Sequence, residues 1–278
     1  MQKGSLMSFE KIRADKALVE RGLAPTRQKA LRYILAGEVY TAEKRIDKPG
    51  QLLGQEEVEH LLIRQKDKYV SRAAHKLLGA FDVFDISVQG ATAIDVGSST
   101  GGFTQVLLEK GARRVYAVDV GYGQLEMSLR QDSRVVVLER ENMRYLSQDK
   151  IPELLDFFTM DVSFISSRLL LAPLKSFLKE GAKGILLIKP QFEAGRKSVQ
   201  KGIVRDPLVH REVIENMLEY FKSQGWRCLG LAPSPVKGTK GNREFLAFLE
   251  LAPFEPIDEI VIDRLIHASE EMEDSVSS

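Results

Sequence analysis

The sequence predicts an α/β fold in which a mostly parallel sheet ends in an antiparallel hairpin, with a small α+β domain in front of it. Three observations predict this fold. Residues 93–121 read as strand, glycine-rich loop, helix and strand, in the letters AIDVGSSTGGFTQVLLEKGARRVYAVDVG. Apolar strand-like runs then alternate with helical patterns, which is typical of a parallel sheet covered by helices. The last two apolar runs are joined by PSPVKGTKGNR, which is too short for a helical crossover, so these two strands must be antiparallel.

The N-terminal elements are short. A helical pattern covers about residues 9–21, and a second one is capped by Thr26 and ends at Gly37. The β-like pieces EVYT and KRIDKPG follow, with a further apolar piece at residues 58–63. The segments RADKAL, TRQKA, GEV and KPG resemble the consensus of the small RNA-binding fold named after ribosomal protein S-four. The alternative is a small helical subdomain with solvated charges.

The positive charge of the chain lies mainly in its first part, although the net charge of the whole is only +1. Residues 1–80 carry 16 Lys and Arg against 10 Asp and Glu, whereas residues 81–278 carry 24 against 29. This asymmetry indicates a polyanionic partner bound mainly from the N-terminal side, unless it is only a solvated basic face. Phosphate contacts there would position RNA and would not read its sequence. The basic residues expected to make them are Arg13, Lys16, Arg27, Lys29, Arg32, Lys44, Arg45 and Lys48.

A charged linker and a helix are expected between this domain and the glycine-rich loop. The linker is RQKDKYV, residues 64–70. The helix is SRAAHKLLGAFDVF, which carries Arg72, His75 and Lys76, so one or more of these could reach a ligand held in the loop. On pattern alone, Lys76 is more often an ordinary surface lysine.

The remaining elements continue the alternation of strands and helices. The third, fourth and fifth strands are RVVVLE, LLDFFTMDVSF and KGILLIKPQFE, and the last two place Asp161 and Lys189 at their exits. We expect one helix over about residues 167–179 and another after 206–207, an Asp-Pro pair suited to an N-cap and first turn. The closing hairpin is WRCLGLA and EFLAFLE, and Glu244 opens its last strand.

The glycine-rich loop DVGSSTGG restricts the kind of ligand. A Walker loop would need G-K-[ST], which is absent, and the G-x-G-x-x-G of dinucleotide-binding proteins does not fit the spacing. The order D-x-G-x-x-x-G fits S-adenosylmethionine better, because that cofactor presents an amino-acid end and no pyrophosphate to the loop. Asp119, about 20 residues beyond the loop, can accept hydrogen bonds from ribose hydroxyls. A glycine-rich turn that serves packing alone is the alternative.

Polar residues stand at the carboxyl edge of the predicted sheet, where ligands of such sheets bind. Each of these residues alone is as often a surface or ion-pair residue as a site residue. Their common position at one edge favours a ligand-binding site. The residues expected at this edge are Asp95, Asp119, Asn142, Asp161, Lys189 and Glu244. Those expected to contact the cofactor are Asp95, Gly97, Ser98, Ser99, Thr100, Gly101, Gly102, Phe103, Asp119, Asn142 and Asp161.

Seven segments carry a closer resemblance, in the order YVSRAAHKL, DVGSSTGGFT, VYAVDVGYGQL, MDVSFIS, LIKPQFEAGR, KGIVRDP and KGTKGNREFL. Behind an S-four-type domain, they resemble the TlyA, or hemolysin A-like, family of ribosomal RNA 2′-O-methyltransferases, over about residues 10–250. The resemblance implies a Rossmann-like methyltransferase sheet, S-adenosylmethionine as cofactor, and ribosomal RNA or ribosomal subunits as partner. It indicates no oligomeric state.

The resemblance also implies catalytic residues, because the family's methyltransferase domain is similar to FtsJ-type ribose methylases, which share a Lys-Asp-Lys-Glu tetrad. The tetrad falls on Lys76, Asp161, Lys189 and Glu244. The chain departs from the family pattern at residues 73–75, Ala-Ala-His in place of a glycine pair and an apolar residue, which puts the backbone path beside Lys76 in doubt. It departs again at Gln105, where an Asp commonly follows GGFT, and this change leaves the loop intact.

The tetrad suggests a mechanism for methylating a ribose hydroxyl. We hypothesise that Lys189 orients the hydroxyl and, as a neutral amine, accepts its proton, while the charge of Lys76 favours that neutral form. Asp161 and Glu244 then orient the two lysines. A second lysine lowers the pKa of an amine and carboxylates raise it, and the sequence leaves open which effect prevails.

Composition argues against several other classes of protein. No apolar run approaches the roughly 18 residues that a membrane helix needs, and the start MQKGSLMSFE lacks the apolar core of a signal peptide, so we expect a cytoplasmic protein. Cys228 is the only cysteine and the four histidines stand singly, so we expect no disulfide and no metal site.

We expect four segments along the chain. They are an S-four-type domain at 8–63, a linker at 64–70, an FtsJ-like methyltransferase domain at 71–252, and a tail at 253–278. The tail has a net charge of −7, and it either covers a surface or stays disordered. The alternative functions are a non-catalytic RNA-binding or ribosome-assembly factor, a membrane-active hemolysin, a nicotinamide oxidoreductase and a small-molecule methyltransferase.

Overall fold

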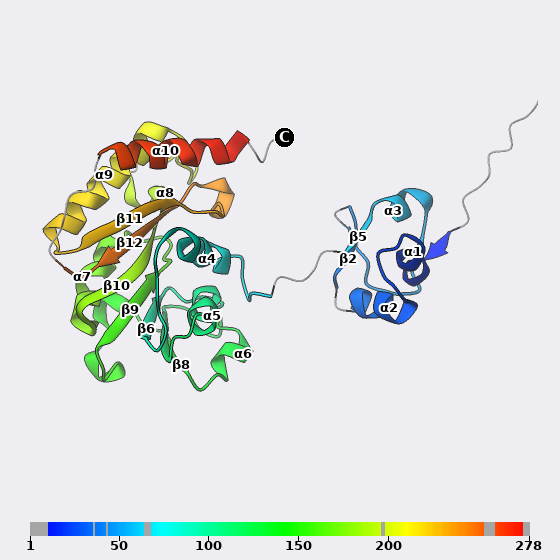
Figure 1. Cartoon of the computed structure of the whole chain (residues 1–278), viewed down its shortest axis with the longest axis horizontal. Helices are drawn as coiled ribbons and strands as arrows, with labels where there is room; N and C mark the ends of the chain where they lie inside the picture. The colour runs from blue at the N-terminus through cyan, green and yellow to red at the C-terminus, as the bar shows by residue number, and fades with distance from the viewer. Residues whose placement is uncertain are drawn as a thin grey trace, which may run out of the picture. The chain divides into compact units, whose positions relative to one another are not determined.

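The computed structural model divides the chain into two compact units, Met1–Lys68 and Tyr69–Ser278 (Figure 1). The residues that it describes are 11–35, 37–42, 44–63, 68–195, 198–252 and 259–274. The expected linker therefore falls mostly on residues 64–67, outside the described part of the chain. None of the described helices is both long and apolar enough to span a membrane.

The first unit packs helices against two small antiparallel sheets, one with the strand order β1-β4 and one with the order β3-β2-β5. Its core contains Leu18, Ile34, Val39 and Leu53. The elements are β1 (Ile12–Arg13), α1 (Ala14–Glu20), α2 (Arg27–Leu35), β2 (Val39–Thr41), β3 (Lys44–Arg45), β4 (Leu52–Leu53), α3 (Gln55–Glu59) and β5 (Leu61–Ile63).

The ends of these helices follow from local chemistry. The Thr26 hydroxyl oxygen accepts the backbone N–H of Lys29 at 3.2 Å, as expected of an N-terminal cap, and Gly37 has a φ of 72° just after α2. The first helix is shorter than expected, because Ile12 and Arg13 pair with β4 as a strand. The two residues at the start of that expected helix, 9 and 10, lie outside the described part of the chain.

The second unit is built on one seven-stranded sheet with the order β11-β12-β10-β9-β6-β7-β8. The strands from β10 to β8 are parallel, and β12 is antiparallel to both of its neighbours, so the predicted mostly parallel sheet with a closing antiparallel hairpin is confirmed. The strands are β6 (Thr92–Val96), β7 (Arg114–Asp119), β8 (Val135–Glu139), β9 (Leu155–Met160), β10 (Leu178–Ile188), β11 (Arg227–Pro233) and β12 (Phe245–Glu250).

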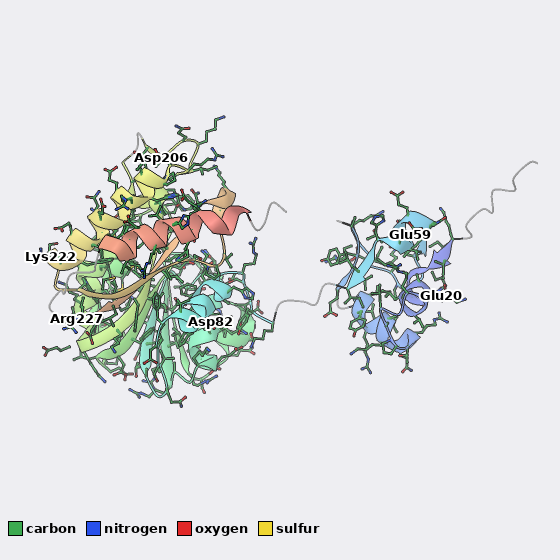
Figure 2. All side chains as sticks on the ribbon, turned by 45° about the horizontal axis from the view of Figure 1, so that its top comes forward. Glu20, Glu59, Asp82, Asp206, Lys222 and Arg227 are labelled. Carbon is green, nitrogen blue, oxygen red and sulfur yellow. The ribbon has the colours of Figure 1, made fainter. Side chains whose placement is uncertain are left out.

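Helices contribute to two apolar layers against this sheet. One layer contains Leu77 of α4 and Leu107 of α5, and the other contains Leu171 of α7 and Ile214 of α9. Figure 2 shows α9 running between the labelled Asp206 and Lys222. The helices are α4 (Ala74–Val83), α5 (Gly102–Glu109), α6 (Met127–Arg130), α7 (Arg168–Leu174), α8 (Pro190–Glu193), α9 (Pro207–Ser223) and α10 (Glu259–Asp274).

Of two expected helical segments, one is shorter than expected and the other begins as expected. The helix expected over residues 167–179 ends at Leu174 and is followed by a 3₁₀ turn, because Leu178 already pairs with Leu155 of β9. The cap at 206–207 is confirmed, since the Asp206 carboxylate accepts the backbone N–H of Leu208 at 2.9 Å.

The acidic C-terminal segment covers a surface over its described residues. It forms α10, whose Ile262, Leu265 and Ile266 are buried in the same apolar layer as α9, at the i, i+3, i+4 spacing of an amphipathic helix. Arg211 of α9 forms an ion pair with Asp263. Residues 253–258 and 275–278 lie outside the described part of the chain.

Candidate active site

Two cavities open at the carboxyl edge of the sheet, and they share part of their lining. The larger has a volume of about 470 Å³ and the smaller about 220 Å³. The expected cofactor residues that line the larger cavity are Gly97, Ser99, Asp119, Asn142 and Asp161. Those that line the smaller cavity are Gly97, Ser98, Ser99, Thr100, Gly102, Phe103 and Asp161, and Lys189 lines it as well.

Glycine is required at two points of the loop between β6 and α5. Gly97 has a φ of 82°, and a Cβ there would lie 2.6 Å from the backbone oxygen of Asp161. A Cβ on Gly102 would lie 2.4 Å from the Ser71 hydroxyl oxygen. The loop is therefore pressed against the exit of β9 on one side and the start of α4 on the other.

Asp119 and Asn142 face the larger cavity from the exits of β7 and β8. The Asp119 carboxylate accepts the backbone N–H groups of Ser99 at 2.8 Å and Gly121 at 2.7 Å, so it links the loop to the end of β7. The Asn142 side-chain oxygen accepts the backbone N–H of Arg144 at 3.0 Å. Both side chains are thus held in fixed positions at the cavity wall.

Asp95 lies beneath the loop, and neither Asp95 nor Gly101 lines either cavity. The Asp95 carboxylate is fully buried and accepts hydrogen bonds from the hydroxyls of Thr104 at 2.7 Å and Thr159 at 2.9 Å. Burial raises the pKa of Asp95 to about 6, against the two hydrogen bonds, and the negative charge of Asp161 adds to the rise. Its geometry suits a residue that anchors α5 and β9 under the site.

The four residues of the expected tetrad come together in one chain of contacts. Lys76 Nζ lies 2.7 Å from Glu244 Oε2 and 3.4 Å from Asp161 Oδ2. Lys189 Nζ lies 2.6 Å from Asp161 Oδ1 and donates to the Ser163 hydroxyl oxygen at 2.9 Å. Lys76, Lys189 and Glu244 are all less than 9% exposed. Each carboxylate thus orients a buried ammonium or amine, and Asp161 lies between the two lysines.

The charge of Lys76 is stabilised by its partners. Burial disfavours the charged form, but attraction to Asp161 and Glu244 outweighs it, so the pKa of Lys76 lies above its ordinary value. The sequence left open whether a second lysine or the carboxylates dominate the pKa of each amine. For Lys76, the carboxylates dominate.

Residues 73–75, which depart from the family pattern, leave Lys76 next to the other tetrad residues. Ala74 begins α4, and Lys76 lies in its first turn, paired with Glu244. Gln105 anchors the approach to this helix, because its side-chain oxygen accepts the backbone N–H of Val70 at 2.9 Å.

Sequence reasoning missed several residues of the cavity wall. Val162, Ser163 and Phe164 follow Asp161 directly and line the larger cavity, and Phe164 is 92% exposed with a φ of 65°. Their position in the segment MDVSFIS, at a strand exit, was the available signal. Strained, exposed aromatic residues of this kind concentrate at functional sites.

Glu139, also missed, fixes the segment that carries Gln124 of the cavity wall. Its carboxylate accepts the backbone N–H groups of Gly123 at 2.9 Å and Gln124 at 3.1 Å, and it pairs with Arg130 at 2.6 Å. The hydrogen bond from Arg130 in particular lowers the pKa of Glu139 to about 2, so the carboxylate stays charged at neutral pH.

In the first unit, three of the arginines expected to bind RNA already have carboxylate partners. Arg13 and Arg27 lie 3.0 Å and 2.7 Å from Asp15, and Arg45 lies 2.6 Å from Asp47. The hydrogen bond from Arg13 lowers the pKa of the buried Asp15 to about 2, and Arg27 contributes further. The phosphate contacts of this unit stay a prediction.

Two family models match the chain. Residues 69–251 match the FtsJ-like methyltransferase family, and residues 12–58 match the S4 domain. The first match covers more than half of the chain, and the second falls on the first unit.

Named relatives and a solved structure are similar over most of the chain. "Putative rRNA methyltransferase YqxC" of Bacillus subtilis is 50% identical over 246 residues, which is 87% of each chain. The "16S/23S rRNA (cytidine-2'-O)-methyltransferase TlyA" of Mycobacterium tuberculosis is 41% identical over 238 residues, 85% of this chain and 89% of the other. The solved structure of a hemolysin-named protein from Streptococcus thermophilus is 38% identical, with a TM-score of 0.75 over 97% of this chain and 99% of that one.

Proposed function

The chain belongs to the FtsJ-like methyltransferase family, and we propose that it transfers the methyl group of S-adenosylmethionine to a ribose 2′-hydroxyl of ribosomal RNA. The observation that carries the proposal is the contact chain Glu244–Lys76–Asp161–Lys189 beside the two cavities. An RNA-binding S4 domain in the same chain, and relatives named as rRNA 2′-O-methyltransferases, support RNA as the substrate. A ribosomal RNA substrate would place the reaction in the cytoplasm.

The cavity residues fit S-adenosylmethionine. Gly97 lets the loop lie against the backbone of Asp161 at the cavity wall, and Asp119 offers carboxylate oxygens for ribose hydroxyls. Apolar side chains in the larger cavity, including Met143 and Leu170, suit a planar base. Ser71 and the loop residues of the smaller cavity suit the amino-acid end. When bound, the cofactor supplies an electrophilic methyl group on a sulfonium.

Lys189 is the residue that we assign to the proton of the ribose hydroxyl. Its Nζ borders the smaller cavity and is held by Asp161 and Ser163, so it can orient the hydroxyl and, when neutral, accept its proton. Lys76 lies on the other side of Asp161, and its positive charge is stabilised there by Asp161 and Glu244. Glu244 keeps Lys76 charged and in place.

Labelled-methyl transfer from S-adenosylmethionine to isolated ribosomal subunits, with mapping of the modified nucleotide, tests the proposal. We expect a labelled 2′-O-methyl nucleotide with the wild type, and a loss of roughly 10²- to 10⁴-fold with Lys189→Ala. Calorimetry should still detect cofactor binding by that variant. Lys222→Ala, an exposed lysine at the end of α9, is the matched control (Figure 2). No transfer by the wild type, or no cofactor binding, would favour a non-catalytic RNA-binding protein.

A further inference from the structure

Two loops of the second unit, residues 198–206 and 234–243, are joined into one structure that we name the double loop. Asn242, only 3% exposed, joins them. Its side-chain nitrogen donates to the backbone oxygen of Gly202 at 2.9 Å, and its side-chain oxygen accepts the backbone N–H of Val204 at 3.1 Å. Lys240 Nζ adds a bond to the backbone oxygen of Lys201 at 3.1 Å. These contacts fix the position of the two loops relative to each other.

The double loop packs directly against the elements that carry Lys76 and Glu244. A Cβ on Gly238 would lie 2.0 Å from Glu244 Oε1, and a Cβ on Gly79 of α4 would lie 2.5 Å from Pro235. The backbone N–H of Ser234 also donates to the backbone oxygen of Glu244 at 2.9 Å. The double loop therefore lies directly beside Glu244 and beside α4, the helix that carries Lys76.

The surface of the double loop is positively charged where it meets the tetrad. A cavity of about 480 Å³ is lined by Lys76, Arg72, Lys237 and Lys240, among others, and a second cavity, which shares Lys240, is lined by Arg205 and Arg243. Among the described residues that line these two cavities, none is acidic. The cations thus form a path that starts at Lys76 and leads away from the proposed methyl-transfer site.

Two lysines of the double loop also hold strained backbone conformations. Lys201 and Lys240 have φ values of 52° and 60°, a region that glycine or asparagine occupies more readily. Such strain is common at functional sites. The ammonium of Lys240 also binds the backbone oxygen of Lys201, so the two strained residues are in contact.

We propose that the double loop binds the sugar–phosphate backbone of the RNA strand next to the ribose presented to Lys189. This inference rests on the proposed function, since it assumes an RNA substrate. Clustered Lys and Arg side chains, such as those that line these two cavities, bind phosphates and position a nucleic acid without reading its bases. The double loop would thus set the register of the strand at the site, separately from any binding by the S4 domain.

The test compares the full-length wild type with the double variant Lys237→Gln/Lys240→Gln. Both residues are exposed, and glutamine keeps a donor of similar reach for the contact with Lys201. The control is Lys179→Gln/Lys222→Gln, which removes two exposed lysines elsewhere in the same unit. Binding of isolated ribosomal subunits is measured between 50 and 200 mM salt without S-adenosylmethionine, and calorimetry measures binding of S-adenosylmethionine separately.

Each lost phosphate contact should lower the slope of log affinity against log salt by about 0.7–0.9, so the loss of affinity over this salt range should shrink about threefold per contact. We expect this change for the Lys237/Lys240 variant, unchanged cofactor binding, and recovery in Lys237→Arg/Lys240→Arg. A salt slope equal to that of the control would overturn the inference, as would a wild type that does not bind the subunits. Because binding is read without methyl transfer, a wild type that binds RNA but transfers no methyl group contradicts only the proposed function.

Discussion

Lys76 Nζ lies 2.7 Å from Glu244 Oε2, although the two residues are 168 positions apart in the chain. The contact joins the first turn of α4 to the residue just before β12, and it closes the set of buried charges around Asp161. The pairing depends on the direction of β12, because only an antiparallel strand at this place brings its start to the carboxyl edge of the parallel strands.

Glu244→Gln should lower methyl transfer by roughly 10²-fold, the low end of what positioned acid–base groups contribute. The glutamine keeps the shape but removes one of the two charges, those of Asp161 and Glu244, that hold the pKa of Lys76 above its ordinary value. Steady-state kinetics with ribosomal subunits measures the effect, and cofactor affinity should stay unchanged. Glu250→Gln, which alters an ion-paired glutamate at the far end of β12, is the control. Equal turnover of the two variants would show that the charge of Glu244 does not contribute to methyl transfer.

Asp95→Asn should flatten the dependence of stability on pH between about 4 and 6. The pKa of Asp95 rises from 3.8 to about 6 in the folded chain, so the folded state binds more protons than the unfolded state in this range, and stability falls as pH rises through it. The variant should lose this decline, which is at most about 3 kcal/mol. Urea unfolding followed through Trp226, the only tryptophan, reports on the second unit. Parallel stability curves for variant and wild type would contradict the assignment.

Glu139→Gln should weaken S-adenosylmethionine binding by about tenfold, since hydrogen bonds to a charged group are worth about 1.5–3 kcal/mol. The residue holds the backbone of Gly123 and Gln124 beside the larger cavity. Its pKa is lowered to about 2, so the wild-type contact is complete above the ordinary glutamate pKa and is lost only as the pH falls towards 2. Calorimetry at neutral pH measures the difference, and an affinity equal to that of wild type would show that the loop is held by other contacts.

Leu265→Ala in α10 should destabilise the second unit by about 2–4 kcal/mol, because it leaves a cavity between the helix and the sheet. Leu265 is 4% exposed, whereas Val261 on the same helix is 37% exposed, so Val261→Ala is the matched control. Trp226 fluorescence during urea unfolding reads both variants. Equal stability of the two would mean that α10 rests on the sheet without contributing to its stability.

The apolar pattern was sufficient to predict Asp161, Lys189 and Glu244 at one edge of the sheet, whereas Lys76 was added to them by the resemblance to the Lys-Asp-Lys-Glu tetrad. Strand exits follow from the apolar pattern, and the order of the motifs supplied the helix that carries Lys76. The direction in which a side chain points was not predictable in the same way. Asp95 stands at a strand exit like Asp119, yet Thr104 and Thr159 hold it beneath the loop.

Partners distant in the chain account for the other differences. The basic residues of the first unit were expected to form one phosphate-binding set. Asp15 instead pairs with Arg13, two residues away, and with Arg27 once α1 and α2 pack together. The sequence left open whether the acidic tail covers a surface or stays disordered. Its apolar stripe of Ile262, Leu265 and Ile266 is short, and these residues become buried only against the rest of the second unit. The Arg27–Asp15 pair and the packing of this stripe cannot be read from local composition.

The place of β12 in the sheet also bears on the order in which the chain matures. It is the last strand to be synthesised, yet it lies between β10 and β11, which precede it. A nascent chain that ends before Glu244 holds Lys76, Asp161 and Lys189, and it leaves the facing edges of β10 and β11 without their partner. The insertion of this one strand therefore completes both the sheet and the set of buried charges in the same step.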